Sequence, residues 1–393
     1  MELNFQSGAQ LLLVASVVAI LARRFRLPYS VGLVAAGIIL SMLPFAPKVN
    51  LTKGLIFTGL LPPLLFEAAL YIPWDQLRRD FPIVVLLATL GVLLSACVTA
   101  AGMHYLAHWQ WLGALVFGVL IAATDPVSVI ATFREARVHG RLRVLIEAES
   151  LLNDGTAAVA FGIVIALAAG QQLTSLEITA TLLRIIAGGI LCGAAVSFGA
   201  LLLAGRTDDH LVEITLTTVA AYGSFLLADD FGLSGVLATI TAGFVMGNFK
   251  SLNAISERGK GAVQAFWEYA AFVANSLIFL LIGIHEAHQN FVAVWLSAGL
   301  AIALVTLGRA VAIYPCCLTF SRSSLRVTMK HQHVLFWGGL RGALALALAL
   351  GLPPTVPQHE EIITISFAVV AFSVFVQGLT IKPFLRRMGE IPG

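Results

Sequence analysis

Two interruptions, Thr124-Asp125-Pro126 and Gly338-Gly339-Leu340-Arg341-Gly342, each fall in the middle of a long apolar stretch and decide the fold. Proline removes a backbone donor and breaks a helix, and clustered glycines weaken one. Helices interrupted at corresponding positions of two halves are typical of transporters built from inverted repeats, with the binding site between the breaks. The pattern therefore predicts a site where the two interrupted segments meet.

The composition requires a bilayer as the solvent. Hydrophobic residues make up 59% of the 393-residue chain and charged residues 11%, whereas soluble domains carry roughly 25% charged residues. Each membrane span needs about 20 mostly apolar residues. We predict an all-α integral membrane protein without a soluble domain and with about 13 transmembrane helices, near residues 8–25, 28–46, 51–72, 81–106, 111–133, 141–169, 176–204, 210–229, 233–248, 260–284, 291–319, 330–352 and 361–384.

The two interrupted spans are the fifth and the twelfth of this series. Their separation of seven is odd, so they run in opposite directions, as inverted repeats of spans 1–6 and 8–13 require. We therefore expect residues 1–393 to form a single polytopic transporter unit, with repeats of about 8–169 and 210–384. The broken helices of spans 5 and 12 are expected to cross at mid-membrane.

The distribution of positive charge sets the orientation, because cytoplasmic loops carry an excess of Lys and Arg. Of the 24 Lys and Arg residues, nineteen lie in one alternating set of connections, whereas the other set holds only Lys48 and Lys53. The remaining three lie inside spans: Arg184, Arg309 and Arg341. This asymmetry predicts an odd number of spans, with the N-terminus outside and the C-terminus in the cytoplasm.

Five ionisable residues are expected at mid-membrane, where a charge costs about 2.5–3.5 kcal/mol on insertion scales. Their depths follow from the number of residues to the nearest cytoplasmic charge, at about 1.5 Å of rise per residue. These depths are about 14, 12, 20, 20 and 17 Å for Asp125, Glu149, Asp154, Arg309 and Arg341. All five fall within one slab of a hydrocarbon core about 30 Å thick, so they are expected to form one site.

The sixth span reads Glu149-Ser150-Leu151-Leu152-Asn153-Asp154-Gly155. Ser150 and Asp154 are four residues apart and share a helix face, and Glu149 and Asn153 share the neighbouring face. Carboxylate, hydroxyl and amide oxygens suit a hard monovalent cation. Three buried carboxylates would repel one another, so we expect one to pair with an arginine. Burial disfavours the charged form of the other, so that a proton and a cation can compete for it.

Two other classes of protein fit some of the residues. Gly232-Leu233-Ser234-Gly235 matches the short Gly-x-Ser-Gly pattern of rhomboid-type intramembrane serine proteases, but no histidine falls at a matching depth in a later span. His285-Glu286-Ala287-His288 is one residue short of the His-Glu-x-x-His zinc motif. A passive channel is the second alternative, although buried exchangeable carboxylates and paired broken helices favour coupled exchange.

Three motifs resemble the monovalent cation/proton antiporters, in the NhaP-type sodium/proton exchanger branch. They are the runs at 124–129 (Thr-Asp-Pro-Val-Ser-Val), 149–155 and 338–343 (Gly-Gly-Leu-Arg-Gly-Ala), and residues 61–68 (Leu-Pro-Pro-Leu-Leu-Phe-Glu-Ala) also resemble that family. The resemblance covers essentially the whole chain. It implies a thirteen-helix homodimer that works by alternating access, with a mobile core of spans 4–6 and 11–13 and an interface domain formed by the others.

The resemblance also implies roles for single residues. Asp154 would bind the ion and the proton, and Ser150, the backbone carbonyl of Thr124 and, through a water molecule, Asp125 would complete the cation site. Glu149 would border the ion and pair with Arg309. Arg341 would offset the half-helix dipoles at the second break, and Asn153 resembles the electroneutral Asn-Asp branch.

We therefore expect a secondary antiporter that exchanges Na⁺ for H⁺ by alternating access, with Li⁺ or K⁺ as alternative cations, and so acts in pH and sodium homeostasis. It is expected in the cell (inner) membrane as a multi-pass homodimer in contact with lipid. We expect no enzymatic activity, no catalytic residue, no cofactor and no nucleic-acid partner. The metal ligands expected for the transported cation are Asp154, Glu149, Ser150 and Thr124.

Overall fold

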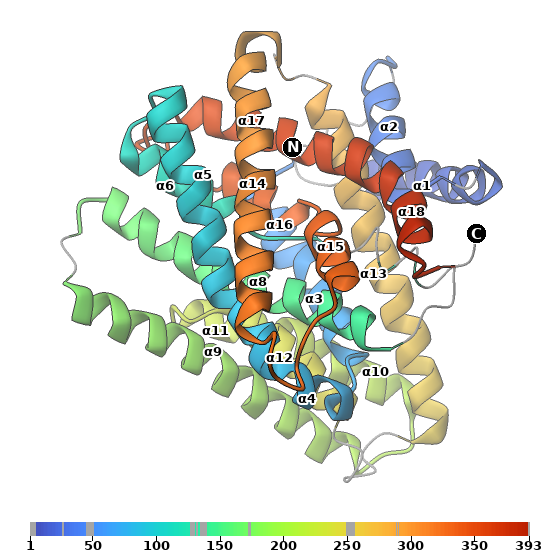
Figure 1. Ribbon diagram of the computed structural model, residues 1–393. Coiled ribbons are helices and arrows are strands. Elements are labelled where there is room, and N and C mark those ends of the chain that lie inside the picture. Colours follow the sequence, from blue (N-terminus) through green and yellow to red (C-terminus); the bar gives the residue numbers. More distant parts are fainter. Residues whose placement is uncertain are drawn as a thin grey trace.

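The computed structural model consists of packed helices (Figure 1) and describes residues 5–25, 27–44, 51–125, 130, 133, 140–171, 174–248, 256–287, 289 and 291–391. No strand occurs in these residues, apart from one isolated bridge between Asp125 and Leu340. The α-helices are α1 (Phe5–Phe25), α2 (Tyr29–Ser41), α3 (Leu61–Leu70), α4 (Trp74–Leu86), α5 (Val92–Ala107), α6 (Trp111–Leu120), α8 (Arg141–Ala168), α9 (Ser175–Ala204), α10 (His210–Thr218), α11 (Ser224–Asp230), α12 (Gly235–Asn248), α13 (Glu257–Glu286), α14 (Trp295–Thr319), α15 (Met329–Trp337), α16 (Ala343–Leu350), α17 (His359–Phe372) and α18 (Gly378–Met388).

The prediction of an all-helical membrane protein is confirmed. Among the described residues, eight continuous helical stretches are long and apolar enough to cross a bilayer, for example Trp74–Ala107 and Arg141–Ala168. Four shorter apolar helices accompany them: Tyr29–Ser41, Leu55–Leu70, Trp111–Leu120 and Gly235–Asn248. The remaining predicted span, 330–352, is the pair α15 and α16 with an irregular segment between them.

Both predicted interruptions are present where the described residues reach them. Helix α6 ends at Leu120, and α15 and α16 are separated by residues 338–342. Pro126 and most of the second half of the fifth span lie outside the described residues, which resume there only at Ile130 and Phe133.

The helices pack in two groups. In the first, α5 packs against α6 and α14, α8 against α4 and α6, and α16 against α17. In the second, α13 packs against α2, α3 and α10, and α12 packs against α3, α9 and α11. Helix α8 also contacts α3 and α12 of the second group, so it lies at the boundary between the two (Figure 1).

Small residues allow the closest helix pairs of the second group to form. A Cβ at Gly37 of α2 would collide with the backbone of Leu280, and one at Gly283 of α13 would collide with that of Val34. Similarly, a Cβ at Gly193 of α9 would meet the backbone of α12. Such close approach gives the dispersion contacts that stabilise helix pairs in lipid, where water supplies no hydrophobic driving force.

Four spans contain a one-turn π-helical segment: η1 (Leu55–Leu60), η2 (Leu87–Gly91), η3 (Val219–Gly223) and η6 (Ser373–Gln377). A π-turn disturbs the regular i→i−4 hydrogen-bond ladder, and a backbone carbonyl released from the ladder needs another donor. At the first three segments a side-chain hydroxyl from another helix donates to a carbonyl of the π-turn. These bonds are Tyr222 Oη to Gly59 O (2.9 Å), Thr156 Oγ1 to Ala88 O (2.5 Å) and Thr239 Oγ1 to Ala221 O (3.2 Å).

Candidate ion-binding site

The two irregular segments cross and are joined by their backbones. The amide of Asp125 donates to the carbonyl of Leu340 at 2.7 Å, as in one rung of an antiparallel ladder. A Cβ at Gly342 would overlap the Asp125 carboxylate, so the glycine at this position allows the segments to approach. The crossing places non-helical backbone in the interior of the protein, where such backbone is tolerated at membrane depth.

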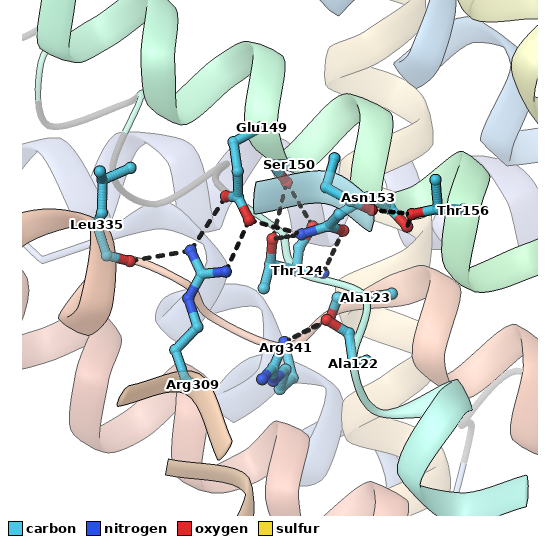
Figure 2. Close-up of polar contacts among 11 residues, drawn as sticks. Ala122, Ala123, Thr124, Glu149, Ser150, Asn153, Thr156, Arg309, Leu335 and Arg341 are labelled. Atoms are coloured by element: carbon cyan, nitrogen blue, oxygen red, sulfur yellow. Dashed lines mark hydrogen bonds and ion pairs between the residues drawn. The ribbon is translucent and has the colours of Figure 1, made fainter. Parts of the chain in front are cut away.

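Arg341 neutralises the end of the first half-helix. Its Nη1 donates to the carbonyls of Ala122 at 2.7 Å and Ala123 at 3.0 Å, and the side chain is buried. These carbonyls follow the C-terminal end of α6, which carries partial negative charge. The guanidinium therefore satisfies backbone acceptors that the break exposes (Figure 2).

Asn153 of α8 holds the irregular segment at Thr124. Its Oδ1 accepts from the Thr124 amide at 3.0 Å, and its Nδ2 donates to Thr124 Oγ1 at 2.6 Å and to Glu149 Oε1 at 3.2 Å. The Ser150 hydroxyl donates to the Thr124 carbonyl at 2.5 Å. Four polar side chains from two elements are thus fixed against one another (Figure 2).

Glu149 and Arg309 form a buried ion pair between α8 and α14. Arg309 Nη1 donates to Glu149 Oε1 at 2.7 Å, and Nη2 donates to Oε2 at 3.0 Å and to the carbonyl of Leu335 at 3.0 Å. The bidentate geometry is the strong form of such a pair. Both carboxylate oxygens of Glu149 are engaged, so the pair has no net charge and ties α8 to α14 and α15.

Asp154 differs from Glu149 in having no hydrogen bond to its buried oxygen. Its Oδ1 is buried and finds no hydrogen-bond partner among the described residues. The side chain borders a cavity of about 220 Å³, together with Thr124, Asp125, Ser150 and Glu67. A buried polar atom without a partner costs free energy, so this carboxyl group is suited to a ligand that the cavity can admit.

A second cavity of about 360 Å³ shares Tyr71 and Glu147 with the first. Its other lining residues lie at the beginnings of α4 and α8 and in the first half of α13: Pro73, Gln76, Gly140, Arg143, Val144, Gln264 and Glu268. Glu147 is held by Arg143, whose Nε donates to it at 2.8 Å. The two cavities are therefore neighbours, and carboxyl groups line both of them: Glu67 and Asp154 in the first, Glu268 in the second and Glu147 in both.

Similarity to known proteins assigns the chain to a family. A family model described as "Sodium/hydrogen exchanger, transmembrane" matches residues 12–387. The chain belongs to this sodium/hydrogen exchanger family. The exchanger is 40% identical over 374 residues to the Na(+)/H(+) antiporter ApNhaP of Aphanothece halophytica, with 93% of this chain and 70% of that protein covered. It is 31% identical over 395 residues to the Na(+)/H(+) antiporter NhaP of Pseudomonas aeruginosa, with 93% and 92% covered.

A solved structure has the same fold as the exchanger. The sodium proton antiporter MjNhaP1 from Methanocaldococcus jannaschii superimposes with a TM-score of 0.77 at 19% identity, and the match covers 97% of both chains. Together with the relatives, this confirms the predicted family and its NhaP-type branch. It also supports the predicted multi-span fold.

The structure separates the predicted site residues of the exchanger into two sets. Thr124, Asp125, Ser150 and Asp154 line the cavity. Glu149 and Asn153 do not line it in the described part of the chain; they support the segment behind it. Helix spacing and the family resemblance together predict all six as one cation-binding group, because they give the helix face of a residue but not the neighbour that occupies it.

Sequence reasoning also left residues of the exchanger unassigned. Glu67 of α3 and Asn275 of α13 line the cavity, and nothing in their spacing relates them to α8. Thr156 of α8 bonds to η2, and a π-turn has no sequence signature that would have predicted this contact.

The protease-like motif has a structural explanation. Ser234 Oγ accepts from the amide of Leu237 at 3.2 Å, at the beginning of α12, which is the bond of a helix cap. Within the described residues, no group of three His, Cys, Asp or Glu side chains is placed to hold a metal ion.

Proposed function

We propose that this exchanger is a secondary antiporter that exchanges Na⁺ for H⁺ by alternating access. One observation carries the proposal: a buried carboxyl oxygen of Asp154 finds no hydrogen-bond partner among the described residues, and the side chain lines a cavity. The relatives named as Na(+)/H(+) antiporters support the choice of ions. The cation and the proton are substrates here, not resident cofactors.

The cation site would use oxygens that are already within reach of one another. The Ser150 hydroxyl now donates to the Thr124 carbonyl at 2.5 Å. When a cation enters, the hydroxyl can turn its proton away and both oxygens can face the ion, beside the Asp154 carboxylate. Asp125 borders the same cavity and would act through a water molecule. Oxygen ligands of this kind suit hard cations.

One proton for one cation follows from the charge balance. The charge of Glu149 is compensated by Arg309 through two hydrogen bonds, and position 153 carries a neutral amide that holds Thr124. Asp125 and Glu67 also line the cavity, and each has an interaction partner of its own. We therefore assign the alternation between a proton and Na⁺ to Asp154, whose buried oxygen finds no hydrogen-bond partner among the described residues. Exchange at one carboxyl group moves one positive charge in each direction, so transport is electroneutral.

The membrane orientation and the moving parts belong to the same proposal. We take the two neighbouring cavities as the route to Asp154, and this route would begin near Gly140 and Arg143 at the start of α8, next to the arginine-rich connections. With the N-terminus outside and the C-terminus in the cytoplasm of the cell membrane, the described conformation is open to the cytoplasm. Spans 4–6 and 11–13 would move as a core against the remaining helices, which hold a second copy in a homodimer.

The experiment is cation-dependent dissipation of a pH gradient in proteoliposomes. Vesicles with an acidic interior should lose the gradient when Na⁺ is added outside, and choline should have no effect. Parallel additions of Li⁺ and K⁺ rank the cations and distinguish a K⁺/H⁺ exchanger of the same family. An imposed membrane potential should leave the rate unchanged. A gradient that no cation dissipates would refute the proposal.

A further inference from the structure

We propose that Thr156 is a positioning residue for the ion-binding carboxylate, because it fixes the rotation of α8 by bonding to the π-turn η2. The inference rests on the proposed function of Asp154 and concerns a residue that does not line the cavity. What points to it is a hydroxyl–carbonyl hydrogen bond between α8 and the neighbouring span, two residues beyond the carboxylate.

The contact joins two helices at the depth of the site. Thr156 Oγ1 donates to the carbonyl of Ala88 at 2.5 Å and lies 3.0 Å from the carbonyl of Asn153 in its own helix. Ala88 lies in η2, where the π-turn interrupts the regular hydrogen-bond ladder. The hydroxyl therefore ties α8 to a carbonyl of this π-turn in the neighbouring span.

The three consecutive residues 154–156 of α8 contact three different parts of the protein. Asp154 borders the cavity. A Cβ at Gly155 would collide with the side chain of Leu237 in α12, so Gly155 faces the second helix group. Thr156 faces η2 in the fourth span. With 100° of rotation per residue, Asp154 and Thr156 lie on nearly opposite sides of α8.

Asp154 depends on this arrangement because its own side chain contributes little to it. Its buried oxygen finds no hydrogen-bond partner among the described residues, so the backbone of α8 determines where the carboxylate lies. Asn153 and Glu149 restrain α8 on the side of the crossing. Thr156 restrains it on the side of the fourth span, through the carbonyl of Ala88. A small rotation of α8 would change the distances from Asp154 to Ser150 and Thr124.

Thr239 offers a control that distinguishes an effect on the position of Asp154 from a general loss of stability. Thr239 of α12 donates to the carbonyl of Ala221 in the π-turn η3 at 3.2 Å, and its side chain is buried. The bond has the same chemistry, a threonine hydroxyl on a π-turn carbonyl. Thr239 lies in the second helix group and does not line the cavity.

The test compares Thr156→Val, Thr156→Ser and Thr239→Val in proteoliposomes, with apparent KM for Na⁺ and maximal rate measured separately. Thr156→Val keeps the shape of the side chain and loses the hydroxyl. It should raise the apparent KM about three- to tenfold, the range expected for one lost hydrogen bond, and change the maximal rate much less. Thr156→Ser keeps the hydroxyl and should stay near the unaltered chain. Thr239→Val should lower the unfolding temperature and leave the KM unchanged.

Two results would overturn the inference while the proposed function stands. One is an equal KM for Thr156→Val and Thr239→Val, and the other is a KM for Thr156→Ser as high as that for Thr156→Val. An unaltered chain that fails to exchange Na⁺ in the same series would refute the proposed function, and the inference with it. The unaltered chain therefore distinguishes the two failures.

Discussion

Two carboxylates on one helix, five residues apart, have opposite surroundings. Glu149 gives both oxygens to Arg309 at 2.7 and 3.0 Å, and it is buried against α14 and α15. Asp154 has a buried oxygen without a hydrogen-bond partner in the described residues and borders a cavity. We infer that Glu149, whose charge is fully paired, stabilises the structure. Asp154, which lacks such a pair, is available to a transported ion.

The largest expected effect comes from Asp154→Asn, which removes the group that alternates between a proton and a cation. Exchange should fall to the rate of protein-free vesicles in the pH-gradient assay. The unfolding temperature should stay the same or rise, because the buried oxygen of this carboxyl group finds no hydrogen-bond partner among the described residues. Asp229→Asn, at the exposed end of α11, is the control and should exchange normally. Robust exchange by Asp154→Asn would show that Asp154 is not the carboxyl group that binds the transported ion.

Breaking the ion pair should instead reduce stability. Glu149→Gln or Arg309→Met alone should lower the free energy of unfolding by about 3–5 kcal/mol, because each leaves an uncompensated buried charge. The double variant should recover much of that loss, since it removes both charges, and it should still exchange Na⁺. Thermal unfolding in detergent measures the stabilities, and a double-mutant cycle isolates the coupling. Additive losses in the cycle would mean that the two residues do not stabilise each other.

Ser150→Ala should have a smaller effect than Asp154→Asn or the loss of the Glu149–Arg309 ion pair. The variant loses one neutral oxygen ligand, while Asp154 and the Thr124 carbonyl remain. Apparent KM for Na⁺ should rise about tenfold, in line with the loss of a single polar contact, with exchange still measurable. Ser197→Ala, which removes a buried hydroxyl bonded within α9, should leave KM unchanged. If Ser150→Ala behaves like Ser197→Ala, the Ser150 hydroxyl is not a ligand.

Much of this arrangement could be predicted from the sequence, for physical reasons. Charge inside an apolar stretch is costly, so Asp125, Glu149, Asp154, Arg309 and Arg341 could be identified and placed at one depth. Backbone breaks at Asp125 and Leu340 follow from proline and glycine, and the two segments do meet.

What could not be predicted depends on the neighbours of each side chain. Helix periodicity put Asn153 beside Glu149 but did not reveal that its amide would be used to hold Thr124. Glu67 lies on a span remote in sequence, and only tertiary packing brings it to the cavity. The bond of Thr156 depends on a π-turn in another span.

The central claim is that a proton and a cation compete for the Asp154 carboxyl group, and proton release on cation binding tests it most directly. Purified protein in weakly buffered detergent solution, at a pH where Asp154 is protonated, should release about one proton for each Na⁺ bound, because metal binding to a carboxyl group displaces its proton. Asp154→Asn should release none, and the Glu149→Gln, Arg309→Met double variant should release about as much as the unaltered chain. Equal proton release from Asp154→Asn and the unaltered chain would contradict the account.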